Sequence, residues 1–317
     1  MPAMAPPILV TGAHRSGTTW VGKMLARAPG VAYVHEPFNP QRGPGWVGDR
    51  LPYWYLYVCP ENEGPYLPVF RQVIGLRYPI GRDLARLPAP RFLGQALLEW
   101  WRSVPHRIRG DLALVKDPIA LFSAEWLADR FDARPVVMIR HPAAFAGSLK
   151  RLDWRFDFGN WADQPLLLRD HLAPFEAVIR DVARSPQKHD IIDQAALLWN
   201  GIHYVIRGYR DRHPGWAFVK YEELAADPVP GFLDLFAHLD LPWSEGIRAE
   251  IERFSTGPEE VPPLLHRRVK RDSRAAASTW LHRLTEEERR RIREGTAKVA
   301  RAFYADEDWA PERRAAP

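Results

Sequence analysis

A glycine-containing loop near the N-terminus, Gly12–Gly17, constrains the fold of this chain more than any other segment. It follows a short apolar run, Ile8–Val10, and it precedes a helical pattern that starts at Trp20. A loop of this kind between a strand and a helix directs several backbone N–H groups, and the positive end of the helix, at one point. The sequence therefore predicts an anion-binding loop at the end of the first strand.

The loop has the spacing of the Walker A motif but lacks its lysine. That motif reads G-x-x-x-x-G-K-[ST], and Thr18 occupies the lysine position here. The cation is instead Arg15, two residues before the second glycine. A nucleotide-dependent kinase is therefore the less favoured hypothesis, and we find no Walker B aspartate placed to hold magnesium.

Five short apolar runs alternate with helical patterns along the chain. The runs are Ile8–Val10, Val31–Val34, Leu112–Val115, Val136–Ile139 and Ala217–Val219. Such nearly continuous hydrophobicity is typical of parallel strands that are buried on both faces. The helical patterns are Trp20–Ala28, Arg91–Ser103, Ser123–Arg130, Ala143–Arg151, Ile191–Arg212 and Gly231–Leu239. The alternation predicts a three-layer, P-loop-like α/β fold with a central parallel sheet flanked by helices.

One further helix has a clear start signal, because Thr285 and Glu288 have the spacing of a capping box. We expect a single domain, residues 1–317, with two insertions at about 40–110 and 152–190. Aromatic residues are frequent in both, particularly within 40–90 and 152–175. Long insertions on an α/β scaffold commonly form lids and substrate walls. Aromatic residues that cover sheet edges or make a subunit contact are the alternative.

Composition restricts the class of protein. The 317 residues carry a net charge of +5, and no apolar run approaches the roughly 20 residues that span a bilayer. A single cysteine, Cys59, excludes an internal disulfide framework and a multi-cysteine zinc site, and the N-terminus lacks a signal-peptide pattern. We therefore expect a cytoplasmic location. The basic cluster His266–Arg271 suits an anionic ligand or a solvated surface, and no motif for nucleic-acid recognition accompanies it.

A second anion signal follows the fourth apolar run. Arg140 ends that run, and Ser148 lies eight residues later, about two turns into the next helical pattern. An arginine at the carboxyl end of a strand lies where open α/β sheets bind ligands. Its planar guanidinium suits a phosphate, and a serine hydroxyl can supply a further hydrogen bond. The chain thus has two separate candidate anion sites.

Together these segments resemble the sulfotransferase superfamily, whose donor is 3′-phosphoadenylyl sulfate (PAPS). His14–Trp20 is similar to the family's P-K-S-G-T-T-W motif, and Arg140 with Ser148 matches its motif for the 3′-phosphate. Further similar segments occur in the family's order: Val115–Pro118, Val219–Leu224 and Lys270–Thr285. The last segment, and Arg15 in place of the family's lysine, are closest to the carbohydrate O-sulfotransferase branch.

The resemblance implies a role for each matched residue. The donor's 5′-phosphosulfate would be held by the loop residues His14, Arg15, Ser16, Gly17, Thr18 and Thr19. Its adenine would stack on Trp20 and border Tyr221, although both residues could instead be structural. Its 3′-phosphate would be held by Arg140, Ser148, Ser273 and Arg274. The product would be adenosine 3′,5′-bisphosphate (PAP).

The resemblance also points to a general base. The cytosolic branch places a histidine after a strand-end lysine, but Asp117 follows Lys116 here. The segment Tyr33–Phe38 is similar to one in Golgi carbohydrate 6-O-sulfotransferases, a branch in which a glutamate is the base. We therefore favour Glu36, with His35 and Asp117 or another carboxylate as alternatives. Lys116 would lie beside the donor's bridging oxygen or form a plain salt bridge.

The resulting hypothesis is a PAPS-dependent O-sulfotransferase that needs no metal. A carboxylate would remove the proton of an acceptor hydroxyl, while Arg15 and the loop amides would stabilise charge on the departing nucleotide. The resemblance favours a saccharide, glycolipid or glycosylated metabolite as acceptor, and a lipid or an aromatic small molecule is the alternative. A non-catalytic nucleotide-binding protein is the third hypothesis, and the oligomeric state stays open.

Overall fold

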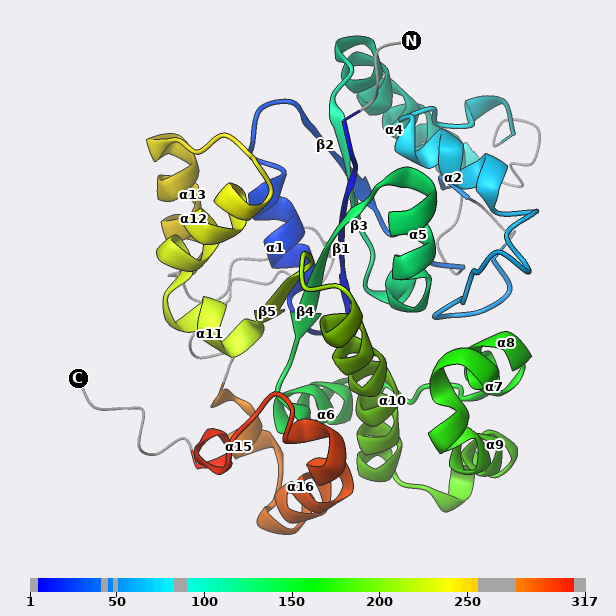
Figure 1. Ribbon diagram of the computed structural model, residues 1–317, viewed down its shortest axis with the longest axis vertical. Coiled ribbons are helices and arrows are strands. Elements are labelled where there is room, and N and C mark those ends of the chain that lie inside the picture. Colours follow the sequence, from blue (N-terminus) through cyan, green and yellow to red (C-terminus); the bar gives the residue numbers. More distant parts are fainter. Residues whose placement is uncertain (1–4, 41–44, 48–50, 83–89, 256–277, 311–317) are drawn as a thin grey trace. The chain divides into compact units, whose positions relative to one another are not determined.

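The computed structural model describes residues 5–40, 45–47, 51–82, 90–255 and 278–310 (Figure 1). Five strands form one parallel sheet in the order β2-β3-β1-β4-β5. They are β1 (Ile8–Gly12), β2 (Val31–His35), β3 (Leu112–Lys116), β4 (Arg134–Ile139) and β5 (Ala217–Lys220). All five predicted strands are present, and the predicted α/β class with a parallel sheet flanked by helices is confirmed.

The chain divides into two compact units. One comprises Met1–Val137 with Asp234–Ile247, and the other comprises Met138–Leu233 with Arg248–Pro317. The prediction of a single domain with two insertions is not tested by this division and stays a prediction.

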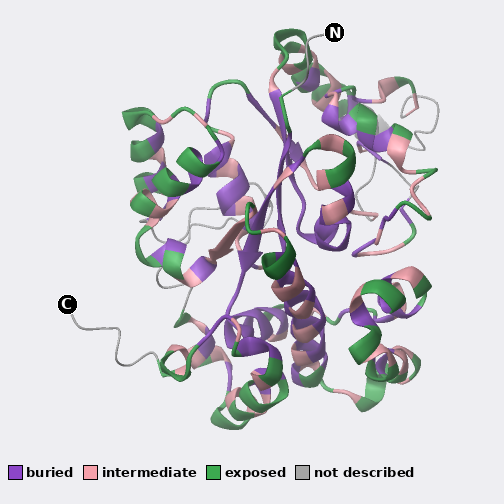
Figure 2. Cartoon of the chain, viewed as in Figure 1, coloured by how far each residue is buried: buried purple, intermediate pink, exposed green. Residues whose placement is uncertain are grey.

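In the first unit, β3 lies between β2 and β1 and pairs with both in parallel. The helices of this unit are α1 (Thr18–Leu25), α2 (Leu67–Ile74), α4 (Pro90–Arg109), the 3₁₀ helix η1 (Pro118–Ser123) and α5 (Ala124–Phe131). Every residue of β1 and β3 is buried, as expected for strands covered on both faces (Figure 2).

The second unit is largely helical. Its helices are α6 (Pro142–Leu152), α7 (Gly159–Ala162), α8 (Pro165–Leu167), the π-helical turn η2 (Leu168–Leu172), η3 (Ala173–Phe175), α9 (Glu176–Arg184), η4 (Pro186–Lys188), α10 (Ile191–Arg212), α11 (Tyr221–Ala226), α15 (Trp280–Arg283), α16 (Glu286–Ala300) and η5 (Asp306–Trp309). Two further helices, α12 (Pro228–His238) and α13 (Glu245–Ser255), each include residues of both units. The long helix α10 packs against α6 and α16.

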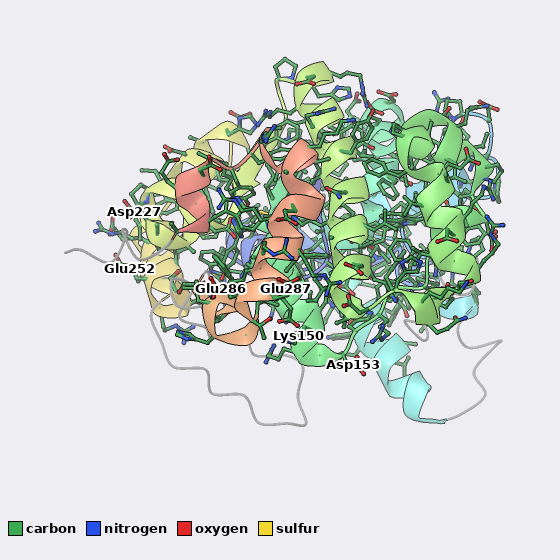
Figure 3. All side chains as sticks on the ribbon, turned by 90° about the horizontal axis from the view of Figure 1, so that it is seen from below. Lys150, Asp153, Asp227, Glu252, Glu286 and Glu287 are labelled. Carbon is green, nitrogen blue, oxygen red and sulfur yellow. The ribbon has the colours of Figure 1, made fainter. Side chains whose placement is uncertain are left out.

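The predicted capping box at the start of α16 is confirmed. The Thr285 hydroxyl accepts from the N–H of Glu288 (3.2 Å), and the Glu288 carboxylate accepts from the N–H of Thr285 (2.8 Å). Lys150 of α6 donates to the same carboxylate (2.7 Å) beside the acidic first turn of α16 (Figure 3). The cap therefore also connects α16 to α6.

Helix ends differ from the prediction by a few residues. Helix α1 starts at Thr18 rather than Trp20, because Gly17 already serves as the N-cap. Helix α4 continues past Ser103 to Arg109 and contains Pro105. Helix α12 starts three residues earlier than predicted, at Pro228, a residue type well suited to the first position of a helix.

Aromatic residues of the second predicted insertion form a small core. Phe156, Phe158 and Trp161 contact one another with ring centroids 5.2–5.6 Å apart, and all three are buried. Gly201 of α10 lies against Trp161, because a Cβ at this glycine would approach the indole to 2.6 Å. These three rings therefore pack inside the second unit.

Gly22 is required for the close packing of α1 on the sheet. A Cβ at this position would lie 2.8 Å from Cγ of Lys116 and 3.2 Å from the ring of Tyr33. We expect Gly22→Ala to lower the free energy of unfolding by about 1–3 kcal/mol, measured by urea titration. Gly295→Ala on α16 is the control, since its Cβ would make only an ordinary contact of 3.7 Å. Equal stability of the two variants would contradict the packing argument.

Candidate active site

The carboxyl ends of three neighbouring strands bring the predicted catalytic segments together. Lys116, the last residue of β3, is in register with Val10 of β1 on one side and with His35 of β2 on the other. The glycine loop follows β1 and Glu36 follows β2, so both lie next to the end of β3. This edge of a parallel sheet is where such folds bind ligands.

The glycine loop has the geometry of an anion-binding site. Gly17 is the N-cap of α1 with a left-handed conformation (φ 92°), and Arg15 also has a positive φ of 65°. Gly17 has no side chain with which to cap this helix end, and the N–H groups of a helix's first turn have no intrahelical acceptor. The first-turn amides of α1 and the positive end of its dipole therefore point toward the space that the loop surrounds.

Two loop side chains are used to shape the loop itself. The Ser16 hydroxyl donates to the carbonyl of Ala13 (2.5 Å). His14 is buried, and both its backbone N–H (2.9 Å) and its Nδ1 (2.8 Å) contact the hydroxyl of Tyr55. Burial, assisted by Arg15, lowers the pKa of His14 to about 3, so its ring is neutral. The backbone N–H of His14 thus already has an acceptor within the protein. Trp20, the residue predicted to stack on adenine, is buried.

A buried ion pair joins two of the three predicted catalytic residues. The Lys116 side chain is fully buried, and its Nζ contacts Oε1 of Glu36 in a short ion pair. The other Glu36 oxygen accepts from the amide of Asn39 (3.2 Å). The backbone also connects them, because the N–H of Glu36 donates to the carbonyl of Lys116 (2.8 Å). Of the two roles predicted for Lys116, the structure contains the salt bridge.

Glu36 is an ionised carboxylate in a constrained backbone. Burial raises its pKa, but the Lys116 ammonium and His35 lower it more, so the pKa is below its ordinary value. Its side chain is 23% exposed, and its backbone is left-handed with a φ of 47°. A non-glycine residue in this conformation is uncommon and is found preferentially at functional sites.

The structure gives Asp117 a positioning role. Its Oδ2 accepts from the N–H of Phe38 (2.6 Å) and its Oδ1 from that of Ile119 (3.0 Å). Asp117 therefore fixes the turn that carries Glu36 and begins η1. Burial and the nearby Glu36 carboxylate raise its pKa to about 7. Because the Asp117 side chain is fully buried whereas that of Glu36 is partly exposed, Glu36 is the better placed of the two carboxylates to meet a ligand.

His35 is the remaining alternative base. Its side chain is 38% exposed, and its Nε2 lies 3.9 Å from Oε1 of Glu36. The ring stacks on Tyr33 with a centroid distance of 5.9 Å, and Nδ1 is 3.4 Å from the Tyr33 hydroxyl. His35 thus lies beside the Glu36 carboxylate.

The second candidate anion site lies in the other unit and is centred on Arg140. Its guanidinium lies 3.8 Å from the centroid of the Tyr221 ring, and its Nε is 3.4 Å from Oε1 of Glu222. The side chain is only 9% exposed. The hydroxyl of Tyr304 donates to the second oxygen of Glu222 (3.0 Å). A buried arginine held between an aromatic ring and a carboxylate is pre-oriented for a bidentate anion.

Buried side chains of α10 hold the backbone at Arg140. The Trp199 indole N–H donates to the carbonyl of Arg140 (2.8 Å), and the N–H of Arg140 donates to Nε2 of His203 (3.5 Å). His203 also contacts the carbonyl of Trp199 (2.9 Å) through Nδ1 and stacks on that indole. The sequence did not predict these two contacts. A tryptophan and a histidine four residues apart on an apolar helix have the pattern of ordinary core residues.

Ser148, Ser273 and Arg274 complete the predicted set for the 3′-phosphate. Ser148 is buried on α6, the helix that follows Arg140. Ser273 and Arg274, together with the basic cluster His266–Arg271, lie outside the described residues. Among the described residues, no group of three or more His, Cys, Asp or Glu side chains is placed to hold a metal ion.

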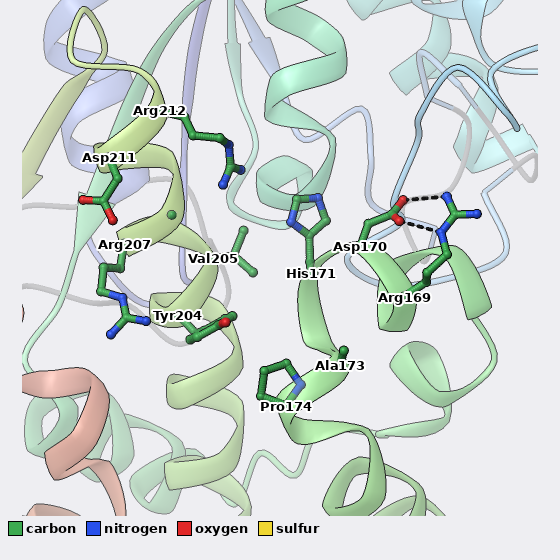
Figure 4. Close-up of a pocket in the computed structure, with 11 residues that line it drawn as sticks. Arg169, Asp170, His171, Ala173, Pro174, Tyr204, Val205, Arg207, Asp211 and Arg212 are labelled. Carbon is green, nitrogen blue, oxygen red and sulfur yellow. Dashed lines mark hydrogen bonds and ion pairs between the residues drawn. The ribbon is translucent and has the colours of Figure 1, made fainter.

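A polar groove of about 360 Å³ lies in the second unit between η2, η3 and α10 (Figure 4). Its charged and aromatic lining includes Arg169, Asp170, His171, Tyr204, Arg207, Asp211 and Arg212. Arg169 is paired with Asp170 (2.6 Å), and Arg207 lies 5.1 Å from the centroid of the Tyr204 ring. The groove thus borders residues of the second predicted insertion and offers both donors and acceptors.

We compared the sequence and the structure with those of known proteins, and the structural comparison identifies the type of fold. Neither a protein-family model nor a characterised protein matches the sequence. The sulfotransferase domain of the olefin synthase from Synechococcus PCC 7002 is similar in structure, with 16% identity over 95% of both chains and a TM-score of 0.50. Two further structures resemble this chain with lower scores. Sulfotransferase STF9 from Mycobacterium avium has 15% identity over 96% of this chain and 78% of its own, with a TM-score of 0.44. Sulfotransferase STF1 from Mycobacterium tuberculosis H37Rv has 16% identity over 93% of this chain and 77% of its own, with a TM-score of 0.36. The first similarity shows that the chain has the fold of a sulfotransferase domain.

The buried histidines make the stability of the protein sensitive to acid. Burial lowers the pKa of His14, His141 and His203 from 6.5 to about 3. Their contribution is complete above about pH 6.5 and is lost as the pH falls toward about 3, because the unfolded chain binds protons first. We expect a slope of up to about 1.4 kcal/mol per pH unit for each histidine.

Urea unfolding at several pH values measures this slope. His203→Gln should reduce the slope, whatever its effect on stability at neutral pH. Identical slopes for the His203 variant and the wild type would show that His203 is protonated in the folded protein.

Proposed function

We propose that this protein is an O-sulfotransferase that uses PAPS as donor. The observation that supports this most directly is the arrangement at the end of β3. There an ionised Glu36 lies beside a buried Lys116 and next to the glycine loop that precedes α1. The similarity of the fold to a sulfotransferase domain is consistent with it. The motif match of His14–Trp20 and of Arg140 with Ser148 supports the same donor.

We propose that the two candidate anion sites bind the two anionic ends of one donor. The amides of Gly17, Thr18 and Thr19 and the side chain of Arg15 would hold the 5′-phosphosulfate. Arg140, with Ser148, would hold the 3′-phosphate, and the Arg140 guanidinium already lies over the ring of Tyr221. Trp20 would border the adenine, and Ser273 and Arg274 would assist at the 3′-phosphate. The bound donor supplies the sulfuryl group and leaves as PAP.

Glu36 would act as the general base. Its carboxylate is ionised, partly exposed and held at one oxygen by Asn39, so it is oriented to accept the proton of an acceptor hydroxyl. Lys116 keeps this carboxylate in place and supplies a positive charge beside the site where negative charge develops. Arg15 would stabilise charge on the departing nucleotide. None of these residues requires a metal ion for its role.

For the acceptor we propose a hydroxyl on a saccharide, glycolipid or glycosylated metabolite. The support is the motif likeness to the carbohydrate branch. A screen of saccharide, lipid and phenolic acceptors with radiolabelled donor would decide among them.

Replacement of Glu36 separates its catalytic role from its structural one. Glu36→Gln leaves the buried Lys116 ammonium without its carboxylate partner, which costs about 3–5 kcal/mol of stability for a buried pair. The double variant Glu36→Gln with Lys116→Met removes both charges, and it should recover most of this loss. Both variants should transfer sulfate at least about 100-fold more slowly than the wild type.

Chemical denaturation and a labelled-sulfate transfer assay give the two readouts. Glu63→Gln, at the ion pair with Arg130 in the same unit, is the matched control and should leave turnover unchanged. A double variant with nearly wild-type turnover would refute Glu36 as the base and leave the pair a structural role only.

A further inference from the structure

The outward face of α4 exposes an unusual number of large apolar side chains. Seven such side chains are exposed in the described part of the chain, and four of them belong to this helix. They are Leu97, Leu98, Trp101 and Ile108, with exposed fractions of 43%, 38%, 69% and 76%. Isolated exposed apolar residues are ordinary, but several on one helix indicate an interaction surface.

These residues form one continuous stripe, which we call the apolar stripe. Its members, including the exposed Pro105, are Leu97, Leu98, Trp101, Pro105 and Ile108. At 3.6 residues per turn they occupy about 100° of the helix circumference. Ala96 and Ser103 are buried on the other side of the helix, which packs against β2. The stripe is therefore apolar surface in addition to the face that α4 already buries.

Positive charge borders the apolar stripe. Arg102 and Arg109 follow one edge of it and are 55% and 56% exposed, and Arg107 is exposed near the end of the helix. Glu99 lies 3.9 Å from Arg102, and Asp111 lies 2.7 Å from Arg109. Residues 96–111 contain three arginines, one glutamate and one aspartate, so the surface has a net charge of +1. Aromatic and aliphatic side chains beside arginines are typical of helices that lie in a membrane interface.

We propose that the apolar stripe of α4 docks on an anionic lipid surface. Trp101 and Ile108 enter the boundary between headgroups and acyl chains, and the flanking arginines contact lipid phosphates. A second copy of the chain is a poorer occupant, because it brings a surface of the same net positive charge. In the described residues, no helix combines the length and apolarity needed to cross a bilayer. This proposal is independent of the proposed transfer reaction.

Sedimentation with lipid vesicles tests the proposal on the full chain. We expect the wild type to bind vesicles of phosphatidylglycerol and phosphatidylcholine, and to bind pure phosphatidylcholine vesicles much less. Trp101→Glu with Ile108→Glu should weaken partition about tenfold or more. The control is Leu152→Glu with Leu233→Glu, which adds the same charge at two positions that are each 45% exposed. This control should retain wild-type binding.

A labelled variant reports on the stripe itself. Cys59 is the only cysteine and is buried, so a fluorophore attached to Ile108→Cys marks α4 selectively. Its emission should shift to the blue with anionic vesicles. Absence of vesicle binding by the wild type, or equal losses in both glutamate pairs, would overturn the proposal. So would a wild-type dimer that Trp101→Glu with Ile108→Glu converts to a monomer while vesicle binding persists, because the stripe would then join two copies.

Discussion

The buried ion pair of Lys116 and Glu36 is the interaction on which the candidate active site depends. A fully buried ammonium is costly unless a carboxylate compensates it, so the end of β3 requires Glu36 at this position. Gly22 leaves room for the stem of Lys116 under α1, and Asp117 holds the turn on which Glu36 lies. Glu36, Lys116 and Asp117 thus stabilise the local fold at the candidate active site.

In the second unit, Arg140 is likewise a buried charge that neighbouring groups compensate. Burying a guanidinium also requires compensation, and Tyr221 and Glu222 provide it through a ring face and a carboxylate. Trp199 and His203 fix the backbone of the same residue from α10. Arg140 is therefore held in one orientation before any ligand binds, which reduces the entropy lost on binding an anion.

Local patterns in the sequence predicted the strands of the sheet and indicated the segments of the candidate site, whereas contacts between distant segments were not predictable. Apolar runs located all five strands, and the spacing of Thr285 and Glu288 located a helix start, because each signal lies within a few residues. The bond from His14 to Tyr55 spans 41 residues and joins the loop to an aromatic-rich segment of no clear period. The bond from Arg140 to His203 spans 63 residues, and nothing in α10 distinguishes that histidine from core.

Composition alone does not determine whether an apolar side chain is buried or exposed. The rings of Phe156, Phe158 and Trp161 belong to an aromatic-rich insertion, and the structure buries them against one another. Trp101 and Ile108 belong to an ordinary amphipathic helix, and the structure exposes them. Periodicity indicates that a face is apolar, but only the packing of the remaining chain decides whether that face is covered.

We propose above all that the chain recognises an adenosine with a phosphate on its 3′ oxygen as well as an anionic 5′ arm. Isothermal titration calorimetry with PAP and with ATP tests it directly, with Arg140→Ala as the comparison. The account predicts saturable binding of PAP without added magnesium, much weaker binding of ATP, and loss of this preference in the variant. Tighter binding of ATP, or an unchanged preference in Arg140→Ala, would contradict it.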